Sequence, residues 1–360
     1  MSKSKNLLVM AAGTGGHVIP GLAVAREMAT RGWHVSWLGT TKGMENRLVP
    51  PSGIALDTID FSGLRGNGLL QTLTGGLRLL LAFWQCVQII RRRRTDLVLG
   101  MGGYVCFPGG LMASLLGKPL LLVNADAALL LSNKALLPVA DRVAFGFDGE
   151  AARRTRNAVV TGNPVRADIE ALPDPADRFE GRRGPLKLLV VGGSLGAKAL
   201  NETLPQALAL IDRSTRPQVT HQTGMAHHAS VTAAYRQQQV DAEILPFIDD
   251  MDQRLGACDV IVCRAGAVTV SELCAGGVAG VLVPLVISTT SHQRDNAQWL
   301  AGYGAGIHLP QSELTPQRLA DVLGGLTREA LLAMAGKARA LARPRAAARV
   351  ADELEGLVAA

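Results

Sequence analysis

The chain has 360 residues, 48% of them hydrophobic, which is enough for two domains that each bury a core. Its net charge of +7 arises entirely in the first half, because residues 1–163 contain 18 Lys and Arg against 9 Asp and Glu, whereas the remainder contains 19 against 21. This asymmetry indicates an anionic partner for the first domain. Only 4% of the residues are aromatic and no recognition-helix or RNA-binding motif occurs, which argues against nucleic acid and leaves a membrane surface or a phosphorylated substrate.

The five cysteines form no C-x-x-C pair, and their number is odd. We therefore expect reduced, mostly buried thiols of a cytoplasmic protein. The apolar run near the N-terminus is too short for a secretory signal, so we expect no export.

Apolar runs alternate with helical patterns along the chain, which is typical of parallel α/β sheets. The predicted strands of the first half are Leu7–Met10, Val35–Leu38, Leu97–Leu99, Leu120–Val123, Arg142–Ala144 and Ala158–Thr161. A second series starts at Leu186 and continues with VTHQTG, AEILPF, the run from Cys258 to Gly266, and GVLVPL. Both series begin with strand, glycine loop and helix, so we predict two similar doubly wound units. Ligands of such sheets bind at the carboxyl ends of the strands, so two units that face each other would form a cleft.

The first glycine loop follows the first predicted strand and opens a helix, in the sequence AAGTGGHVIP. The dinucleotide fingerprint G-x-G-x-x-G fits at Gly13 and Gly15, but Val18 occupies the third glycine position, and no Asp or Glu ends the next strand. An NAD-dependent dehydrogenase is therefore disfavoured. The loop Gly13–His17 could hold an anionic oxygen through its N–H groups, or it could be a tight turn that needs glycine only for positive φ.

The segment Leu69–Ile90, followed by Arg91–Arg94, is apolar over most of a predicted helix surface. Two apolar lines run along it, one formed by Leu73, Leu77, Leu80, Trp84 and Val87 and the other by Leu79, Phe83, Cys86 and Ile90. Gly75, Gly76 and Arg78 interrupt the segment too much for a membrane span. It could be a helix buried between the sheet and its neighbours. We favour a peripheral helix in the membrane interface, with the arginines contacting anionic lipid.

Two loops of the second series have patterns suited to a nucleotide. Gly192–Ala197 opens a helix, so its N–H groups and the Ser194 hydroxyl could hold a diphosphate. A later helix starts near Val268 or Thr269, and Glu272 lies about one turn in. Its carboxylate could accept hydrogen bonds from two ribose hydroxyls, or could stabilise the helix N-terminus. Polar residues suited to sugar hydroxyls begin the following helix, namely His292, Gln293 and Asn296.

Six motifs occur in the order of one known family: GTGGHVIPGLAVA, VLGMGGYVCFPGG, GNPVR, VVGGSLGA, FIDDM and CRAGAVTVSE. With them the chain resembles the bacterial undecaprenyldiphospho-muramoylpentapeptide β-N-acetylglucosaminyltransferases, which form lipid II. The resemblance implies a GT-B fold of two Rossmann-like domains that face a cleft, and no cofactor. It also implies an inverting transfer of GlcNAc from UDP-GlcNAc to the C4 hydroxyl of MurNAc in lipid I. This reaction would take place at the cytoplasmic face of the inner membrane.

By this resemblance, residues 1–163 form an acceptor and membrane-facing domain, residues 164–340 bind UDP-GlcNAc, and residues 341–360 form a C-terminal helix that could return to the first domain. Arg166 and Ser194 are implied to contact the phosphates, the Ile248 backbone the uracil, Glu272 the ribose and Gln293 the GlcNAc hydroxyls. The full set of implied UDP-GlcNAc contacts is Thr14, Gly15, Gly16, Asn124, Arg166, Ser194, Ile248, Ala267, Val268, Thr269, Val270, Ser271, Glu272 and Gln293.

His17 is the candidate general base or hydroxyl orienter, because the pKa of histidine is near neutral; it could instead bond backbone at the helix start. The family pattern H-E-Q-N is absent here, since the chain reads VNAD at Val123–Asp126. Asp126 is a second candidate base, and Asn124 could contact a sugar. Asp250 and Asp252 resemble a D-x-D metal motif, but we expect them to cap a helix and predict no metal.

Two other functions remain open at this point. A UDP-GlcNAc 2-epimerase shares the fold and the donor, but it needs several carboxylates in the cleft and no membrane-facing segment. A nucleotide-sugar-binding subunit that depends on a catalytic partner would explain the altered Val123–Asp126 loop. Acceptor-dependent turnover by the single chain would exclude both.

Overall fold

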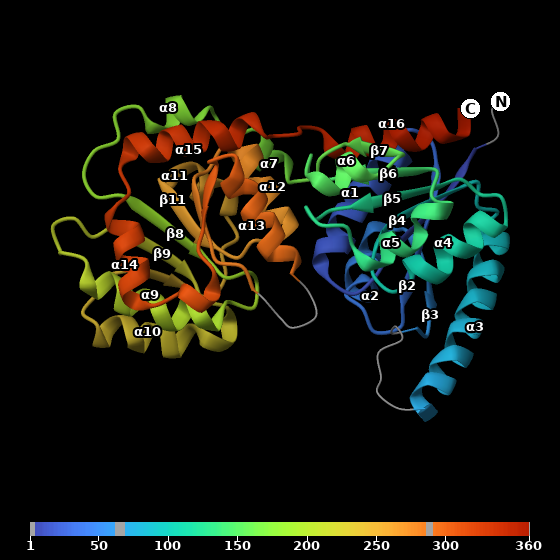
Figure 1. Ribbon diagram of the computed structural model, residues 1–360, viewed down its shortest axis with the longest axis horizontal. Helices are drawn as coiled ribbons and strands as arrows, with labels where there is room; N and C mark the ends of the chain where they lie inside the picture. The colour runs from blue at the N-terminus through green and yellow to red at the C-terminus, as the bar shows by residue number, and fades with distance from the viewer. Residues whose placement is uncertain (1–3, 62–68, 286–290, 360) are drawn as a thin grey trace. The chain divides into compact units, whose positions relative to one another are not determined.

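The computed structural model describes residues 4–61, 69–285 and 291–359 of the chain. The chain divides into two compact units: the first contains Met1–Pro164 and Arg345–Ala360, and the second contains Val165–Pro344. Figure 1 shows a sheet with helices packed against it in each unit. The expected α/β architecture of two parallel sheets is therefore confirmed.

The first unit is built on a parallel sheet whose strands are connected through helices and loops. Within the described residues its order is β3-β2-β1-β4-β5-β6-β7. The strands are β1 (Asn6–Ala11), β2 (His34–Thr40), β3 (Ala55–Ile59), β4 (Leu97–Gly102), β5 (Leu120–Asn124), β6 (Arg142–Phe145) and β7 (Ala158–Val160). The strand order reverses between β1 and β4, and ligands of doubly wound sheets bind at such a switch point. The register of this pair shifts between Met10 and Ala11, just before the first glycine loop.

Alternate residues of β1 face two different cores. Leu8 and Met10 pack with residues of α3 and α4, whereas Leu7 and Val9 pack with residues of α1 and α16. The helices of this unit are α1 (Gly15–Thr30), α2 (Glu45–Leu48), α3 (Leu69–Arg92), α4 (Cys106–Leu115), α5 (Leu131–Leu136), α6 (Glu150–Arg154) and α16 (Ala346–Ala359), with 3₁₀ turns η1 (Pro50–Ser52) and η2 (Leu137–Val139).

The C-terminal helix α16 belongs to the first unit although the second unit precedes it in sequence. Its buried residues Val350, Ala351 and Leu354 join the core that contains α1. Arg31 at the end of α1 donates to Asp352 at 2.7 Å and to Glu355 at 2.8 Å. The Glu355 carboxylate also accepts a hydrogen bond from the indole nitrogen of Trp33 at 3.1 Å. Burial and ion pairs together therefore fasten the chain end to α1.

Helix α3 presents one apolar face to the core and another to solvent. Ala82, Cys86, Ile89 and Ile90 are buried in the first unit. Leu77, Leu80, Leu81 and Trp84 are 62%, 65%, 52% and 62% exposed, at the i, i+3, i+4, i+7 spacing of one helix face. Leu73, the first residue of the predicted line, lies outside the residues whose side chains are described. The interpretation of the whole segment as a buried helix is therefore wrong for this face.

The arginine run at the C-terminal end of α3 is only partly available to a partner. Arg92 and Arg93 form ion pairs with the buried Asp57 of β3, at 2.6 and 2.7 Å. Arg91 and Arg94 are exposed. In the described ranges, none of the helices combines the length and hydropathy that a bilayer span requires.

The second unit also contains a parallel sheet, with the order β10-β9-β8-β11-β12-β13 in the residues described. Its strands are β8 (Lys187–Val191), β9 (Gln218–Gln222), β10 (Glu243–Leu245), β11 (Val260–Cys263), β12 (Gly280–Leu282) and β13 (Gly306–His308). Its helices are α7 (Ala167–Glu170), α8 (Pro175–Phe179), α9 (Lys198–Leu210), α10 (His228–Gln237), α11 (Met251–Ala257), α12 (Ala267–Gly276), α13 (His292–Gly302), α14 (Pro316–Gly324) and α15 (Arg328–Ala340), with 3₁₀ turns η3 (Met225–His227) and η4 (Gln311–Glu313).

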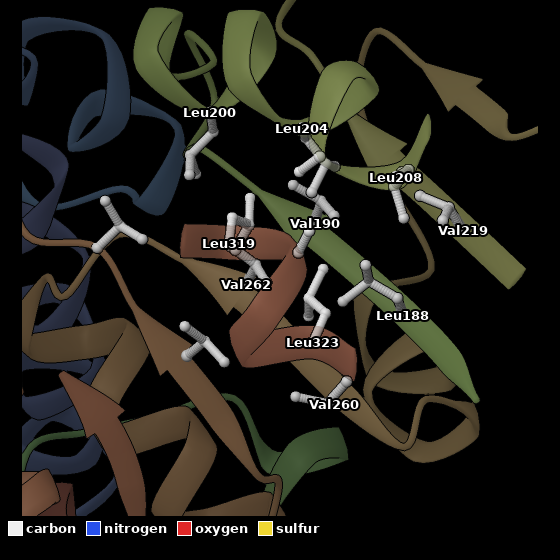
Figure 2. Packing of buried hydrophobic residues seen from close by; sticks show 14 of the residues in the cluster. Leu188, Val190, Leu200, Leu204, Leu208, Val219, Val260, Val262, Leu319 and Leu323 are labelled. Carbon is white, nitrogen blue, oxygen red and sulfur yellow. The ribbon is translucent and has the colours of Figure 1, made fainter. Parts of the chain in front are cut away.

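The core of the second unit lies between its sheet and helices α9 and α14. Figure 2 shows Leu200 and Leu204 of α9 and Leu319 of α14 directed toward Val190 and Val262 of the sheet. The apolar residues of α9 repeat every three or four positions, as expected for a helix buried on one side. This packing fixes the N-terminus of α9, which follows the second glycine loop.

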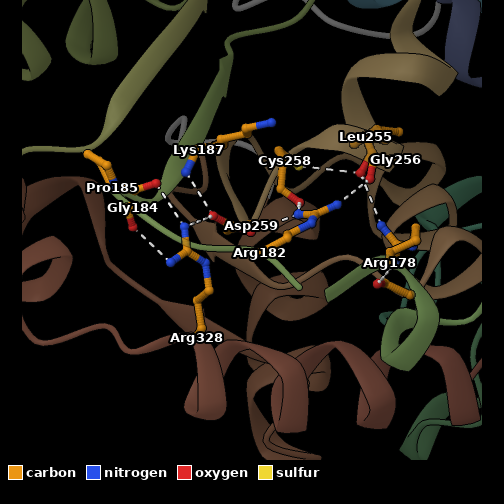
Figure 3. A network of polar contacts seen from close by, with 11 residues as sticks. Arg178, Arg182, Gly184, Pro185, Lys187, Leu255, Gly256, Cys258, Asp259 and Arg328 are labelled. Carbon is orange, nitrogen blue, oxygen red and sulfur yellow. Dashed lines mark hydrogen bonds and ion pairs between the residues drawn. The ribbon is translucent and has the colours of Figure 1, made fainter. Parts of the chain in front are cut away.

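A buried acid organises the opposite, amino-terminal end of this sheet. The Asp259 side chain is fully buried and pairs with Arg182 at 2.7 Å and with Arg328 at 3.3 Å, as Figure 3 shows. It also accepts the backbone N–H of Lys187 at 2.9 Å. Burying a carboxylate is favourable only with such partners, so this network holds the segment before β8 and helix α15 on the sheet.

All five cysteines are buried and free of disulfides, as expected. Burial raises the pKa of the Cys106 and Cys258 thiols to about 12. Neutral, enclosed thiols of this kind are chemically inert and serve as small apolar core residues.

Candidate active site

The first glycine loop leads directly from β1 into α1. Thr14 is the N-cap residue, in extended conformation, and its side chain forms no cap hydrogen bond. Thr14 and Gly16 are exposed, and Gly15 is half-buried. The first N–H groups of a helix generally have no carbonyl partners within it, so the start of α1 can donate hydrogen bonds to a ligand oxygen. The His17 N–H already donates to the Thr14 carbonyl at 3.2 Å, which leaves this role to the residues before it.

The buried carboxylate of Glu45 is hydrogen-bonded to the backbone of the first loop. Glu45 is completely buried, and its Oε2 accepts the Gly13 N–H at 3.0 Å. Its Oε1 accepts both the backbone N–H and the hydroxyl of Thr40, each at 2.7 Å. The sequence analysis did not identify Glu45. The signal was an acid close to the end of a strand, between Lys42 and Arg47 in the sequence KGMENR.

His17 lies in the first turn of α1 and is half-buried. Its ring packs against the backbone of Gly102 at the end of β4, where a Cβ atom would lie 2.6 Å from the imidazole Cδ2. Gly102 also has a φ of +125°. Only glycine leaves space for the imidazole here, so the motif GTGGH packs directly against the motif GMGG through His17 and Gly102.

The side chain of Asn124 forms hydrogen bonds within the loop that follows β5. Asn124 is fully buried, and its Nδ2 donates to the carbonyl oxygens of Asp126 at 2.7 Å and Ala128 at 3.0 Å. Its Oδ1 accepts the Leu130 N–H at 2.9 Å. Both ends of the amide are therefore occupied, which argues against the expected contact between Asn124 and a sugar. Asp126 is half-buried in the same loop.

The second glycine loop, between β8 and α9, is packed against the end of β9. Gly196 has a φ of +78°, and a Cβ atom on it would lie 1.8 Å from the carbonyl oxygen of Thr223. Ser194 and Leu195 are exposed at the tip of the loop. The backbone is thus fixed tightly while the Ser194 hydroxyl remains accessible.

Below this loop, a neutral polar network connects α9, β9 and α10. His221 is fully buried between the Tyr235 hydroxyl, 3.0 Å from its Nδ1, and Asn201 Oδ1, 3.1 Å from its Nε2. Asn201 Nδ2 donates to the carbonyl oxygen of Thr223 at 3.0 Å. Burial lowers the pKa of His221 to about 4, so the imidazole is neutral at physiological pH.

Arg166 and Glu272 are 106 residues apart in sequence and form an ion pair of 3.0 Å. Arg166 precedes α7, and Glu272 lies on α12. Burial raises the pKa of the Glu272 carboxyl, and the guanidinium of Arg166 opposes that shift. The structure therefore brings together the residues implied to bind a phosphate and the adjoining ribose.

Helix α12 begins at Ala267, one or two residues earlier than expected. Ala267, Val268 and Thr269 occupy its first turn and are half-buried, as is Ser271. Val270 is different because its side chain is fully buried and its N–H donates to the Gly266 carbonyl at 2.9 Å. Val270 is thus a core residue, and its position argues against the expected ligand contact.

Two residues of α13 fix neighbouring loops. Asn296 is buried, and its Nδ2 donates to the carbonyl oxygen of Ala265 at 3.0 Å. Gln293 is half-buried, and its Oε1 accepts the Leu285 N–H at 2.9 Å. This bond orients the amide of Gln293 with its two N–H donors directed elsewhere, which suits sugar hydroxyls.

Ile248 is buried, and its N–H donates to Oε1 of Gln222 at 3.0 Å. Its carbonyl is therefore the backbone group that can accept the N3–H of a uracil base. Phe247 next to it is 49% exposed and offers an apolar ring.

Asp250 is the N-cap residue of α11 and Asp252 lies in its first turn, as expected. The Asp250 side chain makes no cap hydrogen bond, however, and pairs with Arg254 at 3.0 Å instead. In the part of the chain that the structure describes, no group of three His, Cys, Asp or Glu side chains is arranged to hold a metal ion.

Comparisons with known proteins cover both units. Residues 7–145 match the glycosyltransferase family 28 N-terminal domain, and residues 187–350 match its C-terminal domain. The chain is 72% identical over 359 residues to the UDP-N-acetylglucosamine--N-acetylmuramyl-(pentapeptide) pyrophosphoryl-undecaprenol N-acetylglucosamine transferase of Methylibium petroleiphilum, with 98% of each chain covered. It is 63% identical to the Chromobacterium violaceum protein of the same name, with 97% of each covered. The crystal structure of Acinetobacter baumannii MurG superposes with a TM-score of 0.86 at 39% identity, over 98% of this chain and 99% of that one.

Proposed function

Because the chain belongs to glycosyltransferase family 28, we propose that it transfers N-acetylglucosamine from UDP-GlcNAc to the MurNAc C4 hydroxyl of lipid I, giving lipid II for peptidoglycan synthesis. It is an N-acetylglucosaminyltransferase, with relatives of that name matched over almost their whole length. The transfer inverts the anomeric carbon in a single displacement. The second unit binds the donor, and the first unit binds the acceptor.

The observation that carries the donor assignment is the 3.0 Å contact between Arg166 and Glu272. In a nucleoside diphosphate the ribose and the first phosphate are adjacent, so their protein partners must be adjacent as well. The Glu272 carboxylate accepts hydrogen bonds from the ribose hydroxyls, and the Arg166 guanidinium pairs with phosphate oxygens. Ser194 adds a hydroxyl donor, and the N-termini of α9 and α12 add N–H groups.

These groups also support the chemistry, because the bond to UDP breaks with negative charge building on the departing diphosphate. Fixed donors that already point at that charge stabilise the transition state more than the ground state. Removing one such donor commonly slows an enzyme by about 100-fold. The residues proposed for this role are Arg166 and Ser194.

His17 is proposed as the base that accepts the proton of the C4 hydroxyl. Packing against Gly102 restricts its ring, and a fixed imidazole can orient a hydroxyl and take its proton. Asp126 is the alternative base in the same unit. The two are distinguished by replacing each with alanine and comparing kcat at saturating substrate.

We assign membrane contact to the exposed stripe of α3, formed by Leu77, Leu80, Leu81 and Trp84. Continued along the helix, this face reaches Gln88 and Arg91, both exposed. Apolar residues followed by a cation suit the boundary between acyl chains and anionic headgroups. Peripheral attachment to the cytoplasmic face of the inner membrane would bring the protein to lipid I, and the basic excess of residues 1–163 supports it.

The central experiment measures UDP release from UDP-GlcNAc by the purified chain, with and without a lipid I analogue. We expect release only with the acceptor. His17→Ala should lower kcat about 100-fold or more and leave UDP affinity unchanged, because a base acts after binding. UDP release without acceptor, or no release at all, would overturn the transferase proposal. Loss of turnover in Asp126→Ala but not in His17→Ala would move the base to Asp126.

Membrane contact is tested by sedimentation with vesicles that contain phosphatidylglycerol. Replacing both Leu80 and Trp84 with serine should weaken binding about tenfold or more, because two apolar side chains lose their place in the bilayer. Leu115→Ser with Leu131→Ser is the matched control, since both leucines are 72% exposed elsewhere on the first unit. Equal loss in both double variants would contradict the assignment to α3.

A further inference from the structure

Gln222 connects two loops of the second unit that are both proposed to hold the nucleotide. It is the last residue of β9, which lies between β8 and β10 in the sheet. Only 2% of its surface is exposed. Its Nε2 donates to the carbonyl oxygen of Gly193 at 2.9 Å, and its Oε1 accepts the N–H of Ile248 at 3.0 Å.

The two contacts require opposite hydrogen-bonding roles. The Gly193 carbonyl, which also accepts the Gly196 N–H at 2.9 Å, takes its second donor from Gln222, and the Ile248 N–H needs an acceptor. A carboxamide supplies one of each. A carboxylate could satisfy only Ile248 and would repel the Gly193 oxygen. An apolar side chain of the same length would remove the acceptor of the Ile248 N–H and leave the Gly193 carbonyl bonded only within its own loop. The position therefore specifies glutamine by chemistry as well as by size.

The two loops would contact different parts of one ligand. Gly193 precedes Ser194, which is proposed to contact the diphosphate, and Ile248 is proposed to contact the base. A rigid link between them sets the distance between the phosphate and base subsites. Preorganisation of this kind raises affinity, because the loops are not ordered again at each binding event.

We propose that Gln222 is a positioning residue that holds the diphosphate loop and the base-reading segment at the separation that UDP requires. This inference rests on the proposed function, because both loops are assigned through it. Gln222 itself touches neither the donor nor the acceptor. Its loss therefore raises the KM for UDP-GlcNAc much more than it lowers kcat.

The test compares Gln222→Met, which removes both bonds, with Gln222→Glu, which keeps only the acceptor for Ile248. Inhibition constants for UDP and UMP are measured beside kcat and KM. We expect Gln222→Met to raise KM about tenfold, with kcat within about threefold of the unaltered enzyme, and to weaken UDP and UMP together. Gln222→Glu should weaken UDP more than UMP, because only the diphosphate loop loses its bond. Gln218→Met, an exposed change on the same strand, is the control.

A residue that serves only stability would lower the unfolding temperature of the variants and leave KM and the ratio of UDP to UMP affinity unchanged. That result would overturn the proposal. Failure of the transferase proposal looks different, since the unaltered chain would then neither bind UDP nor turn over.

A measurement on the unaltered chain provides a second check if both variants misfold. The Ile248 amide hydrogen should exchange with solvent as slowly as the amides of β9, with no nucleotide added, because Gln222 already accepts it. Exchange as fast as that of exposed loop amides would contradict the link.

Discussion

The two glycine loops follow the same plan, strand then loop then helix, but opposite chemistry holds them. The N–H of Gly13 donates to the buried carboxylate of Glu45. The carbonyl of Gly193 accepts from the neutral carboxamide of Gln222. The first loop therefore gives a donor to a carboxylate. In the second loop the Gly193 carbonyl accepts from a neutral amide and from the Gly196 N–H of the loop itself, at 2.9 Å.

This difference indicates which loop suits which part of the substrate. A diphosphate is repelled by a nearby carboxylate and needs free N–H donors, so it fits the second loop. Sugar hydroxyls are neutral and both donate and accept, so they fit the first loop. The family resemblance implied that Thr14, Gly15 and Gly16 contact UDP-GlcNAc. We propose, from the buried Glu45, that they lie near its sugar and not near its diphosphate.

The largest expected effect comes from alanine at one glycine of each loop. Gly196→Ala places a methyl group against the Thr223 carbonyl, so we expect a loss of about 4 kcal/mol or more in unfolding free energy and no measurable UDP binding. Gly13→Ala meets no atom within 4 Å and suffers only from its φ of +95°, which costs about 1–2 kcal/mol. Urea unfolding and calorimetric UDP titration measure both. Equal losses would show that the loops are equally constrained.

Acid should affect the second loop through His221. The pKa of His221 is about 4 when folded and near 6.5 when unfolded, so the unfolded chain binds the proton more tightly. Its contribution to stability is complete above pH 6.5 and decreases as the pH falls toward 4, by about 3 kcal/mol in total. Hydrogen exchange of β8 and β9 peptides between pH 7 and 4.5, with opening free energies corrected for intrinsic exchange, would show this slope. His221→Gln should reduce the slope, whereas His34→Gln, at an exposed position of the first unit, should leave it unchanged.

A smaller effect is expected for Glu45→Gln. The amide has one acceptor oxygen for the three donors that Glu45 now accepts, so the first unit should lose about 2 kcal/mol of stability. The inhibition constant of UDP should stay within about twofold, because the nucleotide is proposed to bind to the second unit. Glu150→Gln, on an exposed helical ion pair, is the control for stability. A large loss of UDP affinity in Glu45→Gln would place the diphosphate at the first loop instead.

The smallest effects come from the two loop hydroxyls. Ser194→Ala should weaken UDP about tenfold, because a hydrogen bond to a charged oxygen is lost. Thr14→Ala should change UDP affinity less than about twofold and act mainly on KM for UDP-GlcNAc. The inhibition constant of UDP, measured by competition with UDP-GlcNAc for each variant, distinguishes the effect of Ser194→Ala from that of Thr14→Ala. The opposite ranking would reverse the assignment of the loops.

The sequence predicted most helices, strands and loops that carry the candidate site. It did not predict most of the residues that form hydrogen bonds with those loops. Strands β3 and β13 were missed, because they are short edge strands with polar or small residues and therefore have a weak apolar signal. The glycine loops and the polar residues after strands could be predicted, because carboxyl ends of parallel strands share one edge.

The supporting residues could not be predicted, because their partners are distant in sequence. Gln222 bonds residues 29 and 26 positions away, and Glu45 bonds one 32 positions away. Asn124 had the right chemistry for a sugar but bonds its own loop. Composition and residue spacing do not indicate which polar side chains form hydrogen bonds within the folded protein and which remain available to a ligand.

The return of α16 to the first unit has a consequence for how the protein is made. The ribosome synthesises residues 346–359 only after the entire second unit. The apolar face of α1 therefore stays uncovered until Val350 and Leu354 are available to pack against it. Synthesis of the first unit thus begins before that of the second unit and ends after it. The second unit can fold while the first unit still exposes apolar surface. A truncation that removes Val350 and Leu354 would therefore expose the core of the unit that is synthesised first.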